Sequence, residues 1–505
     1  MDIRVGSDST SGTRPGLAYA SGPGRWVLLA TILGSAVASI DATSVGIALP
    51  AIGRDFDTGL ATLQWVVTAY TLTLAGLLLI AGALGDRYGR RRVFLIGVAW
   101  FAVASVLCGV APDASTLIGA RALQGVGAAL LTPGSLAILE ASFRQEDRSR
   151  AIGAWSGLGG VATAIGPFLG GWLVQSVSWR LIFAINVPVA AAVIAVARRH
   201  VPESRDTQAT GRVDVSGGTL VTLGLIGLTY GLIEGPGRGW HDPAVLATLV
   251  GGVLALAAFA VRENRAAAPM LPLDLFRSTR FTATNVVTFI VYGALGGALF
   301  LLPIQLQQVS GYDALEAGIA LLPVTVIMLV LSARSGALAA RIGPRLQMSL
   351  GPVIVGAGLA LLVRVGANGD YLSDVLPAVA VFGLGLATTV APLTATVLAA
   401  APARHAGMAS AVNNDVARAA ALIAVAVLPA AAGITGSAYL HPARFSTGFH
   451  TAVLISAALC VLAGGLAALT IRDHPRRPPV AGDGHPLHCG LDAPPPVAGG
   501  HQSSG

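Results

Sequence analysis

Two charged side chains stand inside apolar stretches of the first half of this 505-residue chain. Asp41 lies beside Thr43 and Ser44 in one run, and Arg121 lies well inside another. Such a charge is tolerated where it faces a bundle interior or a wet cavity. Burial makes the charge of Asp41 sensitive to its neighbours, which suits proton or cation binding. The alternatives are a neutral, hydrogen-bonding Asp41 at a kink and an Arg121 bonded only to helix carbonyls.

A second pair of charges lies in the second half of the chain. Asp415 and Arg418 are three residues apart, so a helix would place them on one face, where they can pair. They either neutralise each other in this way or line a cavity in the second half.

A short basic loop is the third chemical feature. It reads Gly85-Asp86-Arg87-Tyr88-Gly89-Arg90-Arg91-Arg92. Its glycines must supply a tight turn between two apolar runs. The carboxylate of Asp86 can face a positive helix N-terminus and pair with Arg90 or Arg91. We name this loop the latch, because such a pair can hold in one conformation and break in another. The alternative is a topology signal with a capping Asp.

Composition sets the elements that must position these residues. The chain is 54% hydrophobic and 11% charged with a mean hydropathy of +0.72, against about 25% charged residues in soluble domains. Lipid is therefore the main solvent, and a soluble enzyme is excluded. Runs of about 20 residues can span the bilayer. Fourteen such runs are predicted, at 26–50, 63–84, 93–111, 115–138, 151–174, 179–198, 214–233, 243–262, 281–303, 315–335, 346–366, 373–399, 406–433 and 449–471.

The basic residues test this assignment. The chain has no Lys, so all 32 basic residues are Arg. With an inside N-terminus, 25 of them fall in inside segments or at the inside ends of spans, five fall in outside segments or at the outside ends of spans, and Arg121 and Arg418 fall well within spans. Cytoplasmic loops retain positive charge, so both termini are predicted to be cytoplasmic. The net charge of +7 is thus a topology signal, and no nucleic-acid partner is expected.

A weak internal repeat divides the chain. The latch recurs as Ala-Ala-Arg-Ile-Gly-Pro-Arg at 339–345, with Ala340 in the place of Asp86, so a second latch there is doubtful. Parallel half-repeats are typical of transporters with a binding site between the halves. We therefore predict an all-α membrane protein of two six-helix halves plus two inserted helices. The predicted parts are a disordered N-terminus at 1–25, a first bundle at 26–200, the inserted pair at 201–265, a second bundle at 266–471 and a disordered tail at 472–505.

The fifth span is rich in glycine. Gly157, Gly159, Gly160, Gly166, Gly170 and Gly171 leave a face almost without side chains. Pro167 removes a backbone hydrogen bond from the same helix. Such a helix can bend and pack closely against another helix.

These features resemble the major facilitator superfamily, and within it the fourteen-helix drug:proton antiporter branch. The resemblance covers about 26–471. Besides the latch, the matching segments are Ile40-Asp41-Ala42-Thr43-Ser44-Val45-Gly46-Ile47-Ala48-Leu49-Pro50, Arg121-Ala122-Leu123-Gln124-Gly125-Val126-Gly127-Ala128-Ala129, Gly166-Pro167-Phe168-Leu169-Gly170-Gly171 and Trp179-Arg180-Leu181-Ile182-Phe183-Ala184-Ile185-Asn186-Val187-Pro188. The departures are Ala162 in place of a usual Gly, Asp415 after two Asn residues, and Ala419 to Ala421 where glycines are usual.

The resemblance implies a function. It implies alternating access in which Arg121 tunes a nearby carboxylate during proton transfer, with Asp41, Arg121, Asp415 and Arg418 as candidates for proton coupling or the substrate cavity. It implies that the glycine face of span five (Gly157, Gly166, Pro167, Gly170 and Gly171) seals the halves on the outer side. The latch residues are Gly85, Asp86, Arg87, Gly89, Arg90 and Arg91. The expected activity is export of small, amphipathic or drug-like molecules in exchange for protons.

Other classes remain as alternatives. They are an exporter or symporter of a specific metabolite or nutrient and a non-transporting membrane receptor. No catalytic or phosphate-binding motif indicates an enzyme. We expect a monomer in the cell membrane, driven by the proton gradient without a cofactor, whose partners are its substrate, protons and lipid. No metal site is predicted, because His485, His488 and Cys489 fit a solvated tail better.

Overall fold

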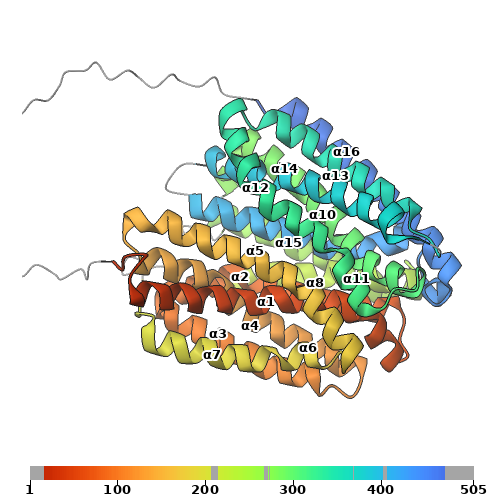
Figure 1. The fold of residues 1–505 in the computed structure, drawn as a ribbon, viewed down its shortest axis with the longest axis horizontal. Coiled ribbons are helices and arrows are strands. Elements are labelled where there is room, and N and C mark those ends of the chain that lie inside the picture. Colours follow the sequence, from red (N-terminus) through yellow and green to blue (C-terminus); the bar gives the residue numbers. More distant parts are fainter. Residues whose placement is uncertain are drawn as a thin grey trace, which may run out of the picture.

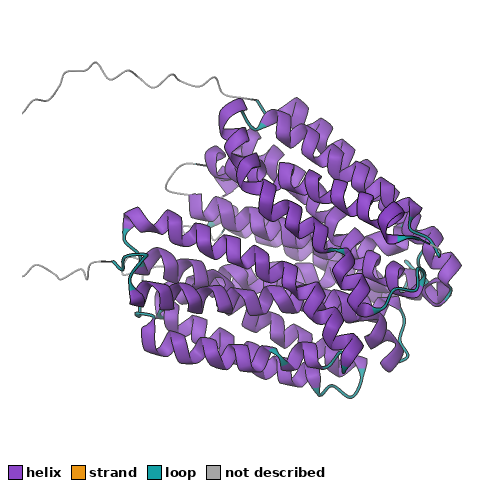
Figure 2. Cartoon of the chain, viewed as in Figure 1, coloured by secondary structure: helices purple, strands orange, loops and turns teal. Residues whose placement is uncertain are grey.

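The computed structural model describes residues 16–205, 214–266, 271, 273–367, 369–401 and 406–472. Helices make up nearly all of these residues, as Figure 2 shows. The expectations for residues 1–15 and 473–505, including His485, His488 and Cys489, lie outside the described residues.

Fourteen helices among the described residues are long and apolar enough to cross a membrane, which confirms the predicted number. The elements of the first half are α1 (Gly22–Asp55), α2 (Leu60–Tyr88), α3 (Arg90–Gly109), α4 (Ala114–Ser142), α5 (Gln145–Ser176), α6 (Leu181–Ala184) and α7 (Asn186–His200). The inserted pair is α8 (Val215–Arg238) and α9 (Pro243–Arg265). The second half has α10 (Thr279–Gln308), α11 (Ala314–Ala320), α12 (Leu322–Ile342), α13 (Arg345–Leu361), α14 (Leu376–Ala400), α15 (Ala406–Ala431) and α16 (Pro442–Thr470).

Two of the predicted spans are broken helices. The sixth span is interrupted at Ile185, between α6 and α7, and the tenth at Leu321, between α11 and α12. Pro188 and Pro323 follow these breaks. A proline has no N–H for the carbonyl four residues earlier, so the preceding helix ends there.

The two halves lie side by side and approach each other most closely toward one end. Figure 1 shows α1 to α7 on one side and α10 to α16 on the other, with the halves converging toward the right of the view. The end of the bundle at which α1 begins and α16 ends is named the near end, and the opposite end the far end. The latch and the loop at 339–345 both lie at the near end, since each follows an even-numbered span.

Small residues set the helix spacing inside each half. A Cβ at Gly127 on α4 would lie 2.7 Å from the backbone nitrogen of Phe101 on α3. In the second half a Cβ at Gly385 on α14 would be in similarly close contact with the backbone of Val355 on α13. Glycine at these crossings lets the backbones approach closely, which is how helices associate in lipid.

The inserted helices pack on the outside of the boundary between the halves. α8 contacts α2 of the first half and α15 of the second half, and α9 packs on α8. At the near end, Arg262 of α9 donates a 2.8 Å hydrogen bond to Asp214, which caps α8. That hydrogen bond from Arg262 lowers the pKa of Asp214 to about 2. This contact between Arg262 and Asp214 links the two inserted helices to each other.

Candidate functional site

Asp41 and Arg121 meet inside the first half. Nη1 of Arg121, on α4, donates to Oδ2 of Asp41, on α1, at 2.5 Å. Asp41 is 0% exposed and Arg121 is 1% exposed. The two opposite charges therefore compensate each other in a place that water does not reach in this conformation.

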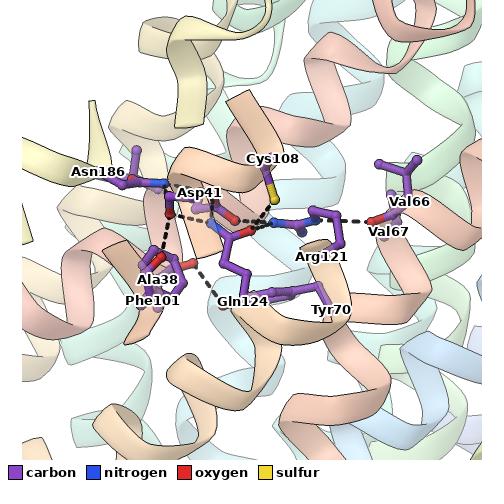
Figure 3. A network of polar contacts seen from close by, with 12 residues as sticks. Ala38, Asp41, Val66, Val67, Tyr70, Phe101, Cys108, Arg121, Gln124 and Asn186 are labelled. Atoms are coloured by element: carbon purple, nitrogen blue, oxygen red, sulfur yellow. Dashed lines mark hydrogen bonds and ion pairs between the residues drawn. The ribbon is translucent and has the colours of Figure 1, made fainter. Parts of the chain in front are cut away.

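Three neutral side chains complete this network (Figure 3). Gln124 donates to Oδ1 of Asp41 at 2.8 Å, and Asn186 donates to the same oxygen at 2.9 Å. Gln124 also accepts from Arg121 at 2.5 Å, and both amides donate to the hydroxyl of Ser105. Four helices, α1, α3, α4 and α7, thus contribute to the site.

The remaining surface of Arg121 is covered by backbone and aromatic rings. Its Nε donates to the carbonyl of Val66 on α2 at 3.1 Å. The guanidinium carbon lies 4.3 Å from the ring centroid of Tyr70 and 5.8 Å from that of Phe183. Arg121 does more than bond to helix carbonyls, so that alternative is wrong. A planar fork that binds a carboxylate, an amide and a carbonyl at once is a task for Arg rather than Lys.

A cavity of about 240 Å³ lies between the halves, and we name it the central cavity. Helices α1, α2, α5, α10 and α15 supply most of its lining. Its hydroxyl groups come from Thr43, Thr68 and Thr71, and the remaining lining is apolar. Ala42 lines the cavity, but Asp41 and Arg121 do not. In this conformation they are therefore not lining residues, although Asp41 precedes Ala42 of the lining and Arg121 binds the carbonyl of Val66, which precedes Val67 of the lining.

The halves are joined at the far end by side chains that cross the boundary. Gln64 on α2 donates to the carbonyl of Val425 on α15 at 2.6 Å. That carbonyl lacks its usual helical partner, because the residue four positions later is Pro429. Gln307 on α10 donates to the carbonyl of Ile47 on α1 at 2.9 Å. These hydrogen bonds must break if the halves separate at this end.

The glycines of α5 fall into two groups. Toward the far end, Gly166 and Gly170 press on α1, and Gly171 presses on Ala314 and Leu315 of the second half. In return, Gly318 on α11 packs against the backbone of Pro167. A larger side chain has no room at these four glycines. This half of α5 is a close contact between the halves.

Toward the near end the same helix borders open space. A Cβ at Gly157, Gly159 or Gly160 would meet nothing within 4 Å. Gly157 and Gly160 line a cavity of about 760 Å³ with α12 and α14 of the second half, which we name the near cavity. The expectation that these three glycines pack closely is wrong in this conformation, and the close glycine contacts between the halves, in the part of the chain that the structure describes, lie toward the far end.

Asp415 and Arg418 do not form the pair that their spacing allows. Among the described residues the structure holds no ion pair or hydrogen bond between their side chains. The buried Oδ1 of Asp415 has no hydrogen-bond partner. Asp415 lines a third cavity, of about 280 Å³, which we name the side cavity. Arg418 is half-buried and is not part of that lining.

The latch pairs Asp86 with Arg90, since Nε and Nη2 of Arg90 both lie 2.8 Å from Oδ1 of Asp86. The N-terminus of α3 is capped by a different carboxylate. Glu203 accepts from the backbone N–H groups of Arg91 and Arg92 at 3.0 and 3.2 Å. The expectation that Asp86 faces this helix N-terminus is therefore corrected. Gly89 has φ +112°, and a Cβ there would lie 2.8 Å from the carboxyl carbon of Glu203.

The corresponding loop of the second half is built differently. Gly343 repeats the left-handed turn of Gly89, with φ +93°. Arg345 donates to the carbonyl of Ala468, near the end of α16, at 2.9 Å. Ala340 offers no carboxylate, so an Asp–Arg pair like that of the latch does not form at this loop.

Sequence reasoning missed Gln124, Asn186 and Glu203. Gln124 follows Arg121 by three residues, which places both on one helix face, and this spacing could have indicated it. Asn186 is a single amide in an apolar run of a matched segment, but nothing in the sequence indicates which side chain it binds. Glu203 is separated from the latch by more than 100 residues, so its role needed the fold.

The architecture defines the class of protein. Two helical halves cross a membrane, enclose a cavity between them and close at one end, which is the arrangement of a secondary transporter. The chain belongs to the Major Facilitator Superfamily, whose family model matches residues 31–426.

Curated relatives cover most of the chain. A tetracenomycin C resistance and export protein of Streptomyces glaucescens is 37% identical over 79% of this chain and 74% of its own length. A methylenomycin A resistance protein of Bacillus subtilis is 35% identical over 90% of this chain and 96% of its own. A puromycin resistance protein of Streptomyces alboniger is 36% identical over 83% of this chain and 84% of its own length. Among solved structures, a peptide transporter in complex with sulfate matches with a TM-score of 0.65 at 13% identity, covering 90% of this chain and 97% of that chain, which shows the shared fold.

Proposed function

We propose that this protein exports small amphipathic or drug-like molecules across the cell membrane in exchange for protons. The observation that carries the proposal is the closed Asp41–Arg121 network directly behind the wall of a largely apolar cavity between the halves. The relatives support the substrate class, because they are named for resistance to, or export of, three different compounds.

The two ends of α5 support alternating access. Close glycine contacts at the far end and open space at the near end describe one of the two states that such a cycle requires. Rocking of the halves would break the bonds of Gln64 and Gln307 and close the near cavity. Both hydrogen bonds join a side-chain amide to a backbone carbonyl. Breaking them therefore does not require a buried ion pair to separate.

Asp41 is the proposed proton-binding group. Protonation would remove the negative charge that Arg121 neutralises, leaving an unpaired cation in the network. An uncompensated buried charge is costly, so the network must rearrange or admit water. Because Ala42 lines the central cavity, a shift of α1 would move part of the cavity wall and change its contacts with the substrate.

The proton gradient is an adequate energy source. A charge crossing 100 mV releases about 2.3 kcal/mol, and one pH unit adds about 1.4 kcal/mol per proton. One proton can therefore sustain a gradient of roughly a few hundredfold for a neutral substrate.

The near end is proposed to be cytoplasmic, with the protein working as a monomer in the cell membrane. The support is the excess of Arg in segments at that end. Reporter fusions after residue 205 should then read inside and fusions near residue 238 outside. An inside reading at 238 would show that α8 and α9 do not cross the membrane.

An efflux panel tests the proposed function. The protein is expressed in a strain that lacks its own pumps, and retention of chemically varied compounds is measured with and without a proton uncoupler. We expect export of several unrelated compounds, abolished by the uncoupler. Export that ignores the uncoupler would overturn proton exchange, and uncoupler-sensitive uptake would indicate a nutrient symporter instead.

A further inference from the structure

The side cavity lies apart from the central cavity, beside the inserted helices. Its volume is about 280 Å³, and its walls come from α2, α8, α9, α15 and a short 3-10 helix at Leu273–Arg277. Leu79, Val221, Leu225 and Phe259 are typical of the lining, which is almost entirely apolar. The two cavities have no lining residue in common.

Among the described residues that line this cavity, Asp415 is the one with an ionisable side chain. Its Oδ1 is buried and makes no hydrogen bond within the described part of the chain. Arg418, one turn along α15, neither pairs with Asp415 nor lines the cavity. A carboxyl group without a partner is costly to ionise in apolar surroundings, so a cation that enters with its own apolar surface would stabilise the ionised form of Asp415 and be held by it.

The walls of the side cavity belong to two bodies. α8 is fixed to α2: a Cβ at Gly76 would meet the side chain of Thr222, and Trp65 donates to Glu234 at 3.0 Å. Asp415 stands on α15, in the second half. A movement of one half against the other would therefore change the distance between Asp415 and the apolar wall.

We propose that the side cavity binds amphipathic monocations, with the positive centre at Asp415 and the apolar body against α8 and α9. As a second substrate site it rests on the proposed export function, but its binding chemistry can be measured without transport. Pockets for small molecules start at roughly 300 Å³, so a compact ligand fits best.

The test is direct binding to the purified full-length protein in neutral detergent, with a micelle-only blank. The probes are benzyltrimethylphosphonium, which carries its charge at one end of a compact apolar body, and benzyltrimethylsilane, which has the same shape and no charge. We expect the phosphonium to bind about tenfold more tightly or better, since a charge pair in an apolar site is weakly screened. Equal binding of both compounds would overturn the proposal and indicate a general apolar pocket.

Variants locate the site. Asp415→Asn should remove the preference for the phosphonium, and Asp415→Glu should keep it. Val221→Trp, which fills the cavity from α8, should weaken phosphonium binding about tenfold or more. Leu223→Trp is the matched control, because Leu223 is 53% exposed on the same helix and should have no effect. Full phosphonium preference in Asp415→Asn, or equal effects of the two Trp variants, would overturn the proposal.

Transport separates this inference from the proposed function. Asp415→Asn should lose export of the phosphonium while an uncharged compound is still exported. Charge-selective binding without export of any compound would support the cation site and contradict the proposed export function. Loss of all export in Asp415→Asn with phosphonium binding intact would instead assign Asp415 to coupling and overturn the cation site.

Discussion

Asp41 and Asp415 are both aspartates inside membrane-spanning helices, yet their surroundings are opposite. Asp41 accepts hydrogen bonds from Arg121, Gln124 and Asn186 and is 0% exposed. Asp415 has a buried oxygen without any partner and borders a cavity. Protonation of Asp41 would break hydrogen bonds of this network and leave Arg121 without its counter-ion, so the network would rearrange. The unpartnered oxygen of Asp415 can instead bind a ligand that enters the side cavity. In the proposals made above, Asp41 binds the proton in the first half and Asp415 binds a cationic ligand in the second half.

The largest difference between the halves should be in stability. Arg121→Leu leaves Asp41 buried without its counter-ion and should cost about 3–5 kcal/mol. Arg418→Leu removes a half-buried charge that the structure does not pair with Asp415, and should cost less than about 1 kcal/mol. Thermal unfolding can be followed by thiol-reactive dye at the buried Cys108 and Cys460 in a Cys489→Ser background. Equal losses of stability in Arg121→Leu and Arg418→Leu would contradict this difference between the two halves.

Asp41→Asn should abolish export against a gradient, reducing it about a hundredfold or more because no proton can then be exchanged at this site. Downhill exchange should persist, since the cavity walls remain. The measurement is efflux in energised vesicles at matched protein amounts. The double variant Asp41→Asn with Arg121→Gln restores electrical neutrality and serves as control, and it should still fail to pump. Full uphill export in Asp41→Asn would move the proton site elsewhere, with Asp415 the next candidate.

Arg121→Lys keeps the charge but not the planar fork. Lys cannot bind the Val66 carbonyl, Asp41 and Gln124 in the same geometry, so coupled export should fall about tenfold or more. The protein should still fold, because the counter-ion of Asp41 remains. Unchanged coupled export at matched expression would mean that charge alone matters at this position.

The smallest effect is expected at the latch, where the halves also differ. The Asp86–Arg90 pair is partly exposed, with 40% and 20% of the side chains accessible. Such pairs contribute at most about 1 kcal/mol, so Asp86→Asn should slow transport about two- to fivefold without lowering expression. Glu146→Gln, an exposed carboxylate at the same end, is the control. Normal transport by Asp86→Asn at normal protein levels would refute the latch.

Hydropathy and the placement of Arg were sufficient to predict the fourteen spans, because lipid requires long apolar helices. The breaks at Ile185 and Leu321 were not predicted, although Pro188 and Pro323 mark them, because a proline inside a span only sometimes ends its helix.

The candidate site was predictable in part. Asp41 and Arg121 stood out because charges are rare in apolar runs. Their partners were not found, because Gln124 and Asn186 are ordinary polar residues until the fold brings α4 and α7 against α1. The side cavity depends on how α8 packs against α15 and how α9 packs against α8, and nothing in one sequence gives the distances between those helices.

The most direct test of proton exchange uses purified protein in liposomes with a pH difference as the only imposed gradient. A non-ionisable exported compound is supplied outside, and a dye inside reports the lumenal pH. The account predicts that acid-loaded vesicles accumulate the compound above its outside concentration while the lumenal pH rises. In protein-free liposomes and in liposomes with the Asp41→Asn protein, the compound should not accumulate and the lumenal pH should not rise with it. Accumulation that does not depend on the pH difference, or that occurs only when the outside is acidic, would contradict the account.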